Sequence, residues 1–256
     1  MRVDGGTAGA VLRFQAAAHE RNRVAVQIES HHVLVYDRGA QLTVGTGCVS
    51  RNGHEAACQV VRKVVVNLGD GNDSAGAGID AGVPVPRVVI HGGPGNDVLD
   101  GQDGPKGEVI DGGPGNDSLT VGGPIIARGA AGNDIFNTIG RVSGALISCG
   151  SGRDQFPDYI GPPFTTRDCE WALTSDGWLH IAFHGRHLSL TFPNQGCAVV
   201  WRLGRHGPQM TTHGRRAGRA VTFTLTHPRY PITIWSKERC VGHARFLLAF
   251  KFASPQ

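Results

Sequence analysis

Short apolar stretches, each followed by a glycine-rich turn, repeat along the middle of the chain. Five of these turns end in an aspartate, and successive aspartates lie 24, 20, 17 and 20 residues apart. The position seven residues before each aspartate and the position two residues after it are apolar, whereas the turn between them is not. The pattern predicts one strand–turn–strand unit repeated in register, with both apolar columns directed into a shared core. The aspartates are Asp73, Asp97, Asp117, Asp134 and Asp154.

Glycine and asparagine dominate the predicted turns. Glycine occupies the second position before every aspartate, at Gly71, Gly95, Gly115, Gly132 and Gly152. The fourth position before it is glycine in four of the five turns, and asparagine directly precedes the aspartate in four. Glycine supplies the positive φ angles of a tight turn and asparagine tolerates them, while frequent Gly and Pro exclude a helix. Coils of about 18–20 residues, stacked on one another, predict a parallel β-solenoid or β-roll.

The flanking segments predict two further all-β modules. Residues 1–60 carry short strand patterns and are predicted to form an N-terminal β cap on the roll, which spans residues 61–170. Residues 171–256 contain strands such as WLHIAFHG and CAVVWRL, at the spacing of a small antiparallel, Ig-like β-sandwich. The cap is needed because the end of a solenoid exposes an open sheet edge.

Charge divides the chain in the same place. Residues 171–256 hold eleven Lys or Arg against two Asp or Glu, whereas residues 1–170 hold fourteen against nineteen. The basic module could bind a polyanion such as an acidic glycan or a cell-wall polymer, while nucleic acid is the less favoured partner. The simpler alternative is a solvated basic face without a partner. No run of 18 apolar residues is present, so no membrane-spanning helix is expected.

The six cysteines allow three disulfides and predict an oxidising compartment. Proximity in sequence favours the pairs Cys48–Cys58, Cys149–Cys169 and Cys197–Cys240. The spacing contains no C-x-x-C, which argues against a zinc ribbon or a thioredoxin-type site.

The aspartate turns have the chemistry of a calcium site. Calcium takes six to eight oxygen ligands, and a carboxylate column at strand spacing would repel itself without a cation. We expect the glycine turns to expose carbonyl oxygens that no N–H group uses, so that two stacked turns complete the shell. The alternative is a metal-free solenoid in which the aspartates only shape the turns.

Two segments, GGPGNDVLD at 92–100 and GGPGNDSLT at 112–120, resemble the haemolysin-type (RTX-like) nonapeptide G-G-x-G-x-D-x-U-x. The resemblance implies a calcium-binding parallel β-roll, with ligands from the aspartates and from turn carbonyls. Lys106 stands where a second turn of the coil would carry its aspartate, so one edge of the roll is predicted to bind metal. The chain through residue 170 is also similar in layout to secreted actinobacterial calcium-binding proteins. The candidate metal residues are Gly71, Asp73, Gly93, Gly95, Asp97, Asp111, Gly113, Gly115, Asp117, Gly132, Asp134 and Asp154.

These patterns predict a non-enzymatic, calcium-stabilised protein that is secreted or displayed at the cell surface. One alternative is an adhesin that binds a glycan through the basic C-terminal module. Another is a carbohydrate-active enzyme built on a solenoid, although the sequence contains no G-x-S-x-G elbow, H-E-x-x-H motif or P-loop.

Overall fold

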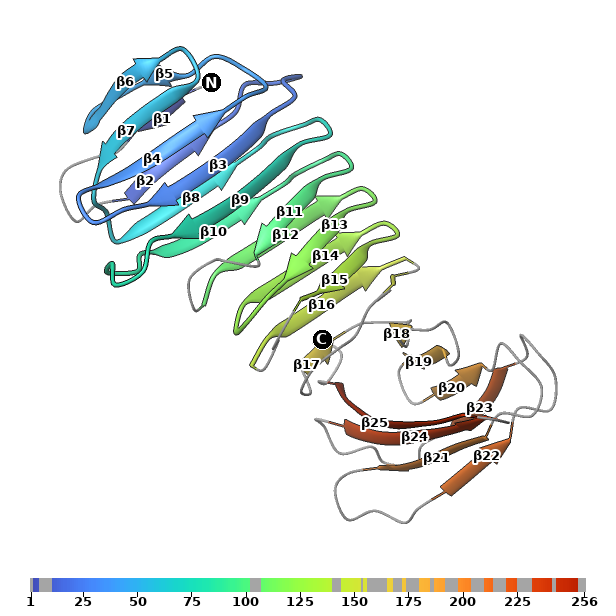
Figure 1. The fold of residues 1–256 in the computed structure, drawn as a ribbon. Helices are drawn as coiled ribbons and strands as arrows, with labels where there is room; N and C mark the ends of the chain where they lie inside the picture. Colours follow the sequence, from blue (N-terminus) through green and yellow to red (C-terminus); the bar gives the residue numbers. More distant parts are fainter. Residues whose placement is uncertain are drawn as a thin grey trace.

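The computed structural model describes residues 2–4, 11–101, 107–139, 144–152 and 154–155, together with the strands of the C-terminal part. Within these residues every regular element is a β-strand, and none is a helix. Two long sheets run through the molecule, and Figure 1 shows their strands stacked one above the next from the N-terminal cap to β16. The prediction of an all-β chain built on a parallel β-solenoid is confirmed.

Each coil of the solenoid gives one strand to each sheet. Successive strands pair in parallel and in register, as in Ile90↔Ile110 of the first sheet and Leu99↔Leu119 of the second. The first sheet contains β2 (Val11–Gln15), β8 (Lys63–Asn67), β10 (Arg87–His91), β12 (Val109–Pro114), β14 (Ile126–Ala131) and β16 (Leu146–Ser151). The second contains β3 (Arg23–Ile28), β9 (Ser74–Ile79), β11 (Val98–Gly101), β13 (Ser118–Val121) and β15 (Ile135–Thr138).

The two apolar columns predicted from the sequence form the core between these sheets. The column before the turns is fully buried, at Val66, Ile90, Ile110, Ala127 and Ile147. The column after the turns is buried at Ala75, Leu99, Leu119 and Phe136, and Phe156 lies outside the described residues. Burial of these columns between coils is the main apolar contribution to the stability of the stack.

A further coil precedes the five glycine-turn repeats. Strand β2 pairs in parallel with β8, and β3 pairs in parallel with β9, so residues 11–28 occupy the next position in the stack. Asn22 takes the place of the aspartate, because its N–H donates to Asp73 Oδ1 at 2.7 Å and its carbonyl accepts from Ser74. His19 has a positive φ of 61° in this turn, and Asp70 accepts from its N–H and lies beside its Nδ1, both at 2.7 Å. The solenoid therefore begins within the segment assigned to the cap.

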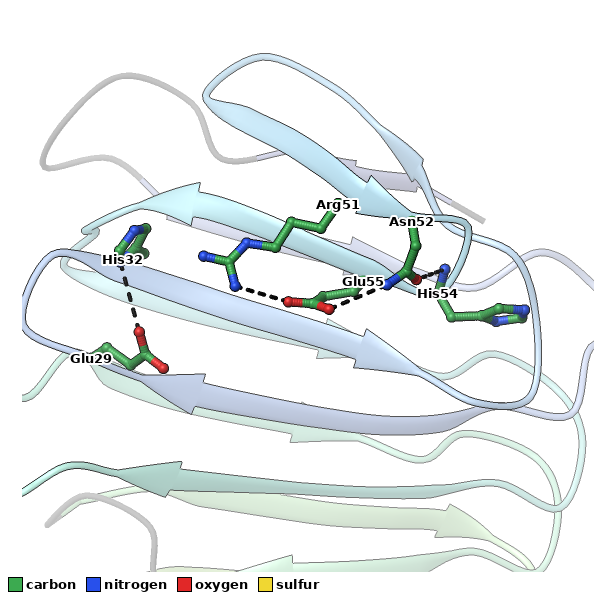
Figure 2. Close-up of polar contacts among 6 residues, drawn as sticks. All are labelled: Glu29, His32, Arg51, Asn52, His54 and Glu55. Carbon is green, nitrogen blue, oxygen red and sulfur yellow. Dashed lines mark hydrogen bonds and ion pairs between the residues drawn. The ribbon is translucent and has the colours of Figure 1, made fainter.

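Five further strands, most of them paired in antiparallel fashion, cover the N-terminal end of the solenoid. They are β1 (Arg2–Asp4), β4 (His32–Asp37), β5 (Thr43–Val44), β6 (Cys48–Asn52) and β7 (Glu55–Gln59). The predicted disulfide Cys48–Cys58 joins β6 to β7. Around their hairpin, Glu55 accepts from Arg51 at 3.0 Å and from Asn52 at 3.2 Å (Figure 2). The edges of both sheets are thus extended by the cap rather than left at the first coil.

Most strands of the C-terminal part pair in antiparallel fashion. The first sheet continues from β16 through β17 (Thr165–Arg167) to β25, and then to β24, β21 and β22. A separate sheet has the order β18-β19-β20-β23. The bounds are β18 (Ala172–Leu173), β19 (His180–His184), β20 (His187–Thr191), β21 (Ala198–Leu203), β22 (Met210–His213), β23 (Ala220–Thr224), β24 (Ile232–Cys240) and β25 (His243–Phe252). Four antiparallel strands thus extend the first sheet and four more form a separate antiparallel sheet, which agrees with the prediction of an antiparallel β module in this part of the chain.

Candidate metal centre: the aspartate column

The turn glycines bring successive coils into contact at one edge of the solenoid. Gly71, Gly95, Gly115 and Gly132 all have φ near 140°, a region that L side chains rarely adopt. A Cβ on Gly95 would lie 1.5 Å from the Gly71 carbonyl oxygen, so only glycine permits this stacking. The positions two residues earlier have φ near 100° at Gly93 and Gly113. Every candidate glycine therefore lies in the predicted turn geometry.

The five aspartates form a single buried column beside these turns. Each is at most 3% exposed. One oxygen of each carboxylate accepts an inter-coil hydrogen bond, because the Asp73 N–H donates to Asp97 Oδ1 at 2.8 Å and the Asp97 N–H donates to Asp117 Oδ1 at 2.8 Å. The same bond links Asp117 to Asp134 at 2.8 Å and Asp134 to Asp154 at 3.0 Å. The sequence predicted the column, and the structure adds that each carboxylate accepts a hydrogen bond from the coil before its own.

In Asp73, Asp97, Asp117 and Asp134 the second carboxylate oxygen is buried and has no hydrogen-bond partner. In three interior coils this Oδ2 lies against a bare glycine: a Cβ on Gly92 would be 2.3 Å from Asp97 Oδ2, and one on Gly112 would be 2.1 Å from Asp117 Oδ2. Gly129 bears the same relation to Asp134, at 2.2 Å. The corresponding residues of the first and last aspartate turns are Leu68 and Cys149, which carry side chains. The three interior turns therefore form a distinct class of site.

Backbone carbonyl oxygens approach these unpartnered carboxylate oxygens. A Cβ on Gly92, 2.3 Å from Asp97 Oδ2, would also be 2.5 Å from the Gly112 carbonyl oxygen, which accepts the Gly93 N–H at 2.9 Å. The equivalent Gly129 position is 2.5 Å from the carbonyl oxygen of Cys149. Beside both Gly92 and Gly129, a carboxylate oxygen therefore lies close to a carbonyl oxygen from the next coil. This donor set is made of hard oxygens, which is the chemistry that calcium requires.

Burial makes the charged form of these carboxylates costly. It raises the pKa of Asp97 to about 7, against the hydrogen bond from Asp73 and together with the charge of Asp117. Burial likewise raises the pKa of Asp117 to about 6 and that of Asp134 to about 6. The pKa of Asp73 is also raised, chiefly by burial. A bound cation would reverse this penalty by compensating the charge.

The asparagines before the aspartates have a role that the sequence did not reveal. None of the described asparagines has a positive φ, so the predicted reason for them is wrong. Their side chains form a second ladder instead, in which Asn72 Oδ1 accepts the Asn96 N–H at 2.8 Å and Asn96 Oδ1 accepts the Asn116 N–H at 2.7 Å. The Asn133 N–H continues the ladder onto Asn116 Oδ1. In this ladder the later coil donates, whereas in the aspartate ladder the earlier coil donates.

The turn carbonyls are less free than the sequence suggested. The carbonyl oxygens of Pro94, Pro114, Ala131 and Ser151 accept hydrogen bonds from glycine N–H groups of the preceding coil, at 2.7–2.9 Å. The expectation that the turn carbonyls lack N–H partners is therefore wrong for these four. The carbonyl oxygens of Gly71, Gly95, Gly115 and Gly132 instead face the Cα of a glycine in the next coil.

One candidate ligand lies outside the column. Asp111 is on β12, where its Oδ2 is 3.7 Å from Arg128 and 3.8 Å from His91 Nδ1. Its neighbours in register are His91 and Arg128, which places it in a partly exposed row of polar side chains. Asp111 contributes its charge to the field at Asp117 but does not join the stacked carboxylates.

No three acidic, histidine or cysteine side chains among the described residues converge as a metal cage. An ion at an interior turn would therefore take one carboxylate oxygen and carbonyl oxygens from the chain, and complete its shell of six to eight with water. The unpartnered, buried Oδ2 atoms and the bare glycines beside them fit such an ion. Cys149 is disulfide-bonded, while the side chains of Cys169, Cys197 and Cys240 lie outside the described set.

Comparison of the chain with protein-family models, with characterised proteins and with solved structures finds no match. Within the described part of the chain, no helix is long and apolar enough to cross a membrane.

Proposed function

We propose that the protein is an extracellular calcium-binding β-roll, in which calcium at the interior aspartate turns stabilises the solenoid for a structural or surface-binding role. One observation carries the proposal: Asp97, Asp117 and Asp134 each hold a buried oxygen without a donor, and each of these oxygens lies against a glycine where any side chain would collide with it. A buried carboxylate without compensation is destabilising, and a divalent cation is the ligand that best offsets a column of them.

Calcium binding would make the stability of the roll depend on the compartment. Binding to the folded chain alone stabilises it by about 2.7 kcal/mol per site when the free ion exceeds the dissociation constant a hundredfold. Extracellular modules bind calcium with dissociation constants of about 0.1–1 mM, close to the concentration outside cells. The disulfide Cys48–Cys58 supports the same assignment, because disulfides persist in oxidising compartments.

The test is thermal unfolding of the whole chain with calcium, with magnesium and with a chelator. Asp97→Asn and Asp117→Asn each retain Oδ1, which accepts the inter-coil N–H, and replace the unpartnered oxygen with an uncharged NH2 group that cannot bind a cation. We expect calcium to raise the melting temperature of the native chain and the double variant to lose most of that rise. A melting temperature that is equal in calcium and in chelator would refute the proposal.

Asp111→Asn is the matched control. It removes one carboxylate from the same strand region, but that carboxylate lies in the row with His91 and Arg128. We expect the calcium-dependent rise to survive in this variant. If Asp111→Asn loses the calcium-dependent rise in melting temperature and the double variant keeps it, the calcium site does not lie in the aspartate column.

A further inference from the structure

A carboxylate lies in the apolar core on the opposite edge of the solenoid from the aspartate column. Glu108 directly precedes β12, and the pairs Val89↔Val109 and Val109↔Ile126 place it level with Val88 and Ile125. Those neighbours are 0% and 1% exposed, and Glu108 itself is 0% exposed. The other members of this inward-facing column are Leu12, Val64 and Ala145. Glu108 is thus a charged residue type at a position that every other described coil fills with an apolar side chain.

Glu108 packs closely against its neighbours in the core. Gly101 on β11 is level with Val121 and with Ala77, which carry side chains at this position. A Cβ on Gly101 would lie 2.5 Å from Ile125 Cδ1 and 3.5 Å from Glu108 Oε2. Ile125 therefore occupies the space that the missing side chain of Gly101 leaves, Glu108 lies beside it at contact distance, and the core stays filled.

Neither carboxyl oxygen of Glu108 has a hydrogen-bond partner. An ionised carboxylate without donors in an apolar site is far more costly than a neutral carboxyl. Burial, followed by the negative charge of Asp100, raises the pKa of Glu108 to about 8. Asp100 is the charged group whose field reaches it, and the inward-facing side chains of the packed strands are Val88, Ile110, Val121, Ile125 and Thr138.

We propose that Glu108 is a proton-binding site in the core that couples the stability of the central coils to pH, so that the solenoid is tight when the carboxyl is protonated and loosens as it ionises. The direction follows from linkage. An acid that holds its proton more tightly in the folded state than in the unfolded state contributes stability at low pH, and that stability is lost as pH rises between the two pKa values. Here the window extends from about 4.5, the ordinary value for glutamate, to about 8.

The experiment is urea-induced unfolding from pH 5 to pH 9 at one saturating calcium concentration, for the native chain and for Glu108→Gln. The variant cannot ionise, so the ratio of the two unfolding equilibrium constants isolates the titration of Glu108 from that of other groups. We expect the native chain to lose stability relative to the variant by about tenfold per pH unit up to about pH 8. A ratio that stays constant over this range would overturn the proposal.

Two further measurements keep the proposal testable if the glutamine variant folds poorly. Glu108→Ile restores the apolar column that Val88 and Ile125 continue, and it should give the same pH-dependent ratio. Carbon-13 NMR of the Glu108 carboxyl in the native chain should show a titration midpoint above pH 7, whereas a midpoint near 4.5 would refute the site. Glu55→Gln is the control, because Arg51 and Asn52 hold that carboxylate at the surface of the cap (Figure 2), and its ratio should stay level over the same range.

Discussion

Replacement of Gly95 by alanine should destabilise the solenoid far more than an ordinary glycine-to-alanine change. The new Cβ would lie 1.5 Å from the carbonyl oxygen of Gly71 and 2.5 Å from its carbonyl carbon, both backbone atoms that cannot rotate away. The two coils must therefore separate at this edge. That movement strains two hydrogen bonds that join these coils, from the Gly71 N–H to the Pro94 carbonyl at 2.9 Å and from the Asp73 N–H to Asp97 Oδ1 at 2.8 Å.

The magnitude follows from three contributions. Holding a non-glycine residue at φ 145° costs about 1–3 kcal/mol. Weakening the two hydrogen bonds costs about 1 kcal/mol each, and repacking around an inserted methyl group adds about 1–3 kcal/mol. We expect a loss of about 4–8 kcal/mol in the free energy of unfolding, which is a large part of the total for a domain.

Gly123→Ala separates the clash from the strain. Gly123 has φ 75°, and a Cβ there would meet no atom within 4 Å. This variant should lose only the conformational term, about 1–2 kcal/mol. Urea unfolding of both variants at one calcium concentration measures the difference. Equal losses in the two variants would show that the coils do not approach as closely as the structure indicates.

Three other changes test separate features. Ala130 has φ 79° and an exposed side chain, so Ala130→Gly should raise the free energy of unfolding by about 0.5–1 kcal/mol. An unchanged urea midpoint would contradict this. The double change Cys48→Ala/Cys58→Ala opens a loop of sequence separation 10 and should cost about 2.5–3 kcal/mol by the chain-entropy model, measured by urea unfolding against the native chain. In chelator, stability should fall as pH rises from about 4 to about 7, because burial raises the pKa values of Asp97, Asp117 and Asp134 in the folded chain. Urea midpoints at several pH values measure this dependence, and calcium should make it weaker. An increase in stability with pH in chelator would contradict the buried carboxylate column.

The repeat could be predicted because each of its columns has one physical cause. Apolar positions at fixed distances from the aspartate face the core, and glycine is required where a carbonyl of the adjacent coil leaves no room for a side chain, as at Gly95. The calcium assignment itself remains a prediction from the sequence, to which the structure adds the unpartnered oxygens and the bare glycines beside them.

Other features could not be predicted, because they depend on contacts between distant residues. The coil at residues 11–28 lacks the glycine pattern, since His19 and Asn22 take over the turn and the aspartate position. Its partner strands lie about fifty residues further along the chain. Glu108 looks like an ordinary loop residue between Gly107 and Val109, and only the strand register shows that it lies in the core.

The coil at residues 11–28 also has a consequence for the order of folding. Its strands must wait for residues 63–79 before they can form their parallel pairs, because β4 to β7 intervene, and this is a long loop to close. Every later coil adds onto a finished neighbour only 17–24 residues away. We therefore expect the cap and the first two coils to form the slow nucleus, and the remaining coils to add in sequence as short, inexpensive steps. A chain synthesised from its N-terminus would complete that nucleus first, and each new coil would then find its template already in place.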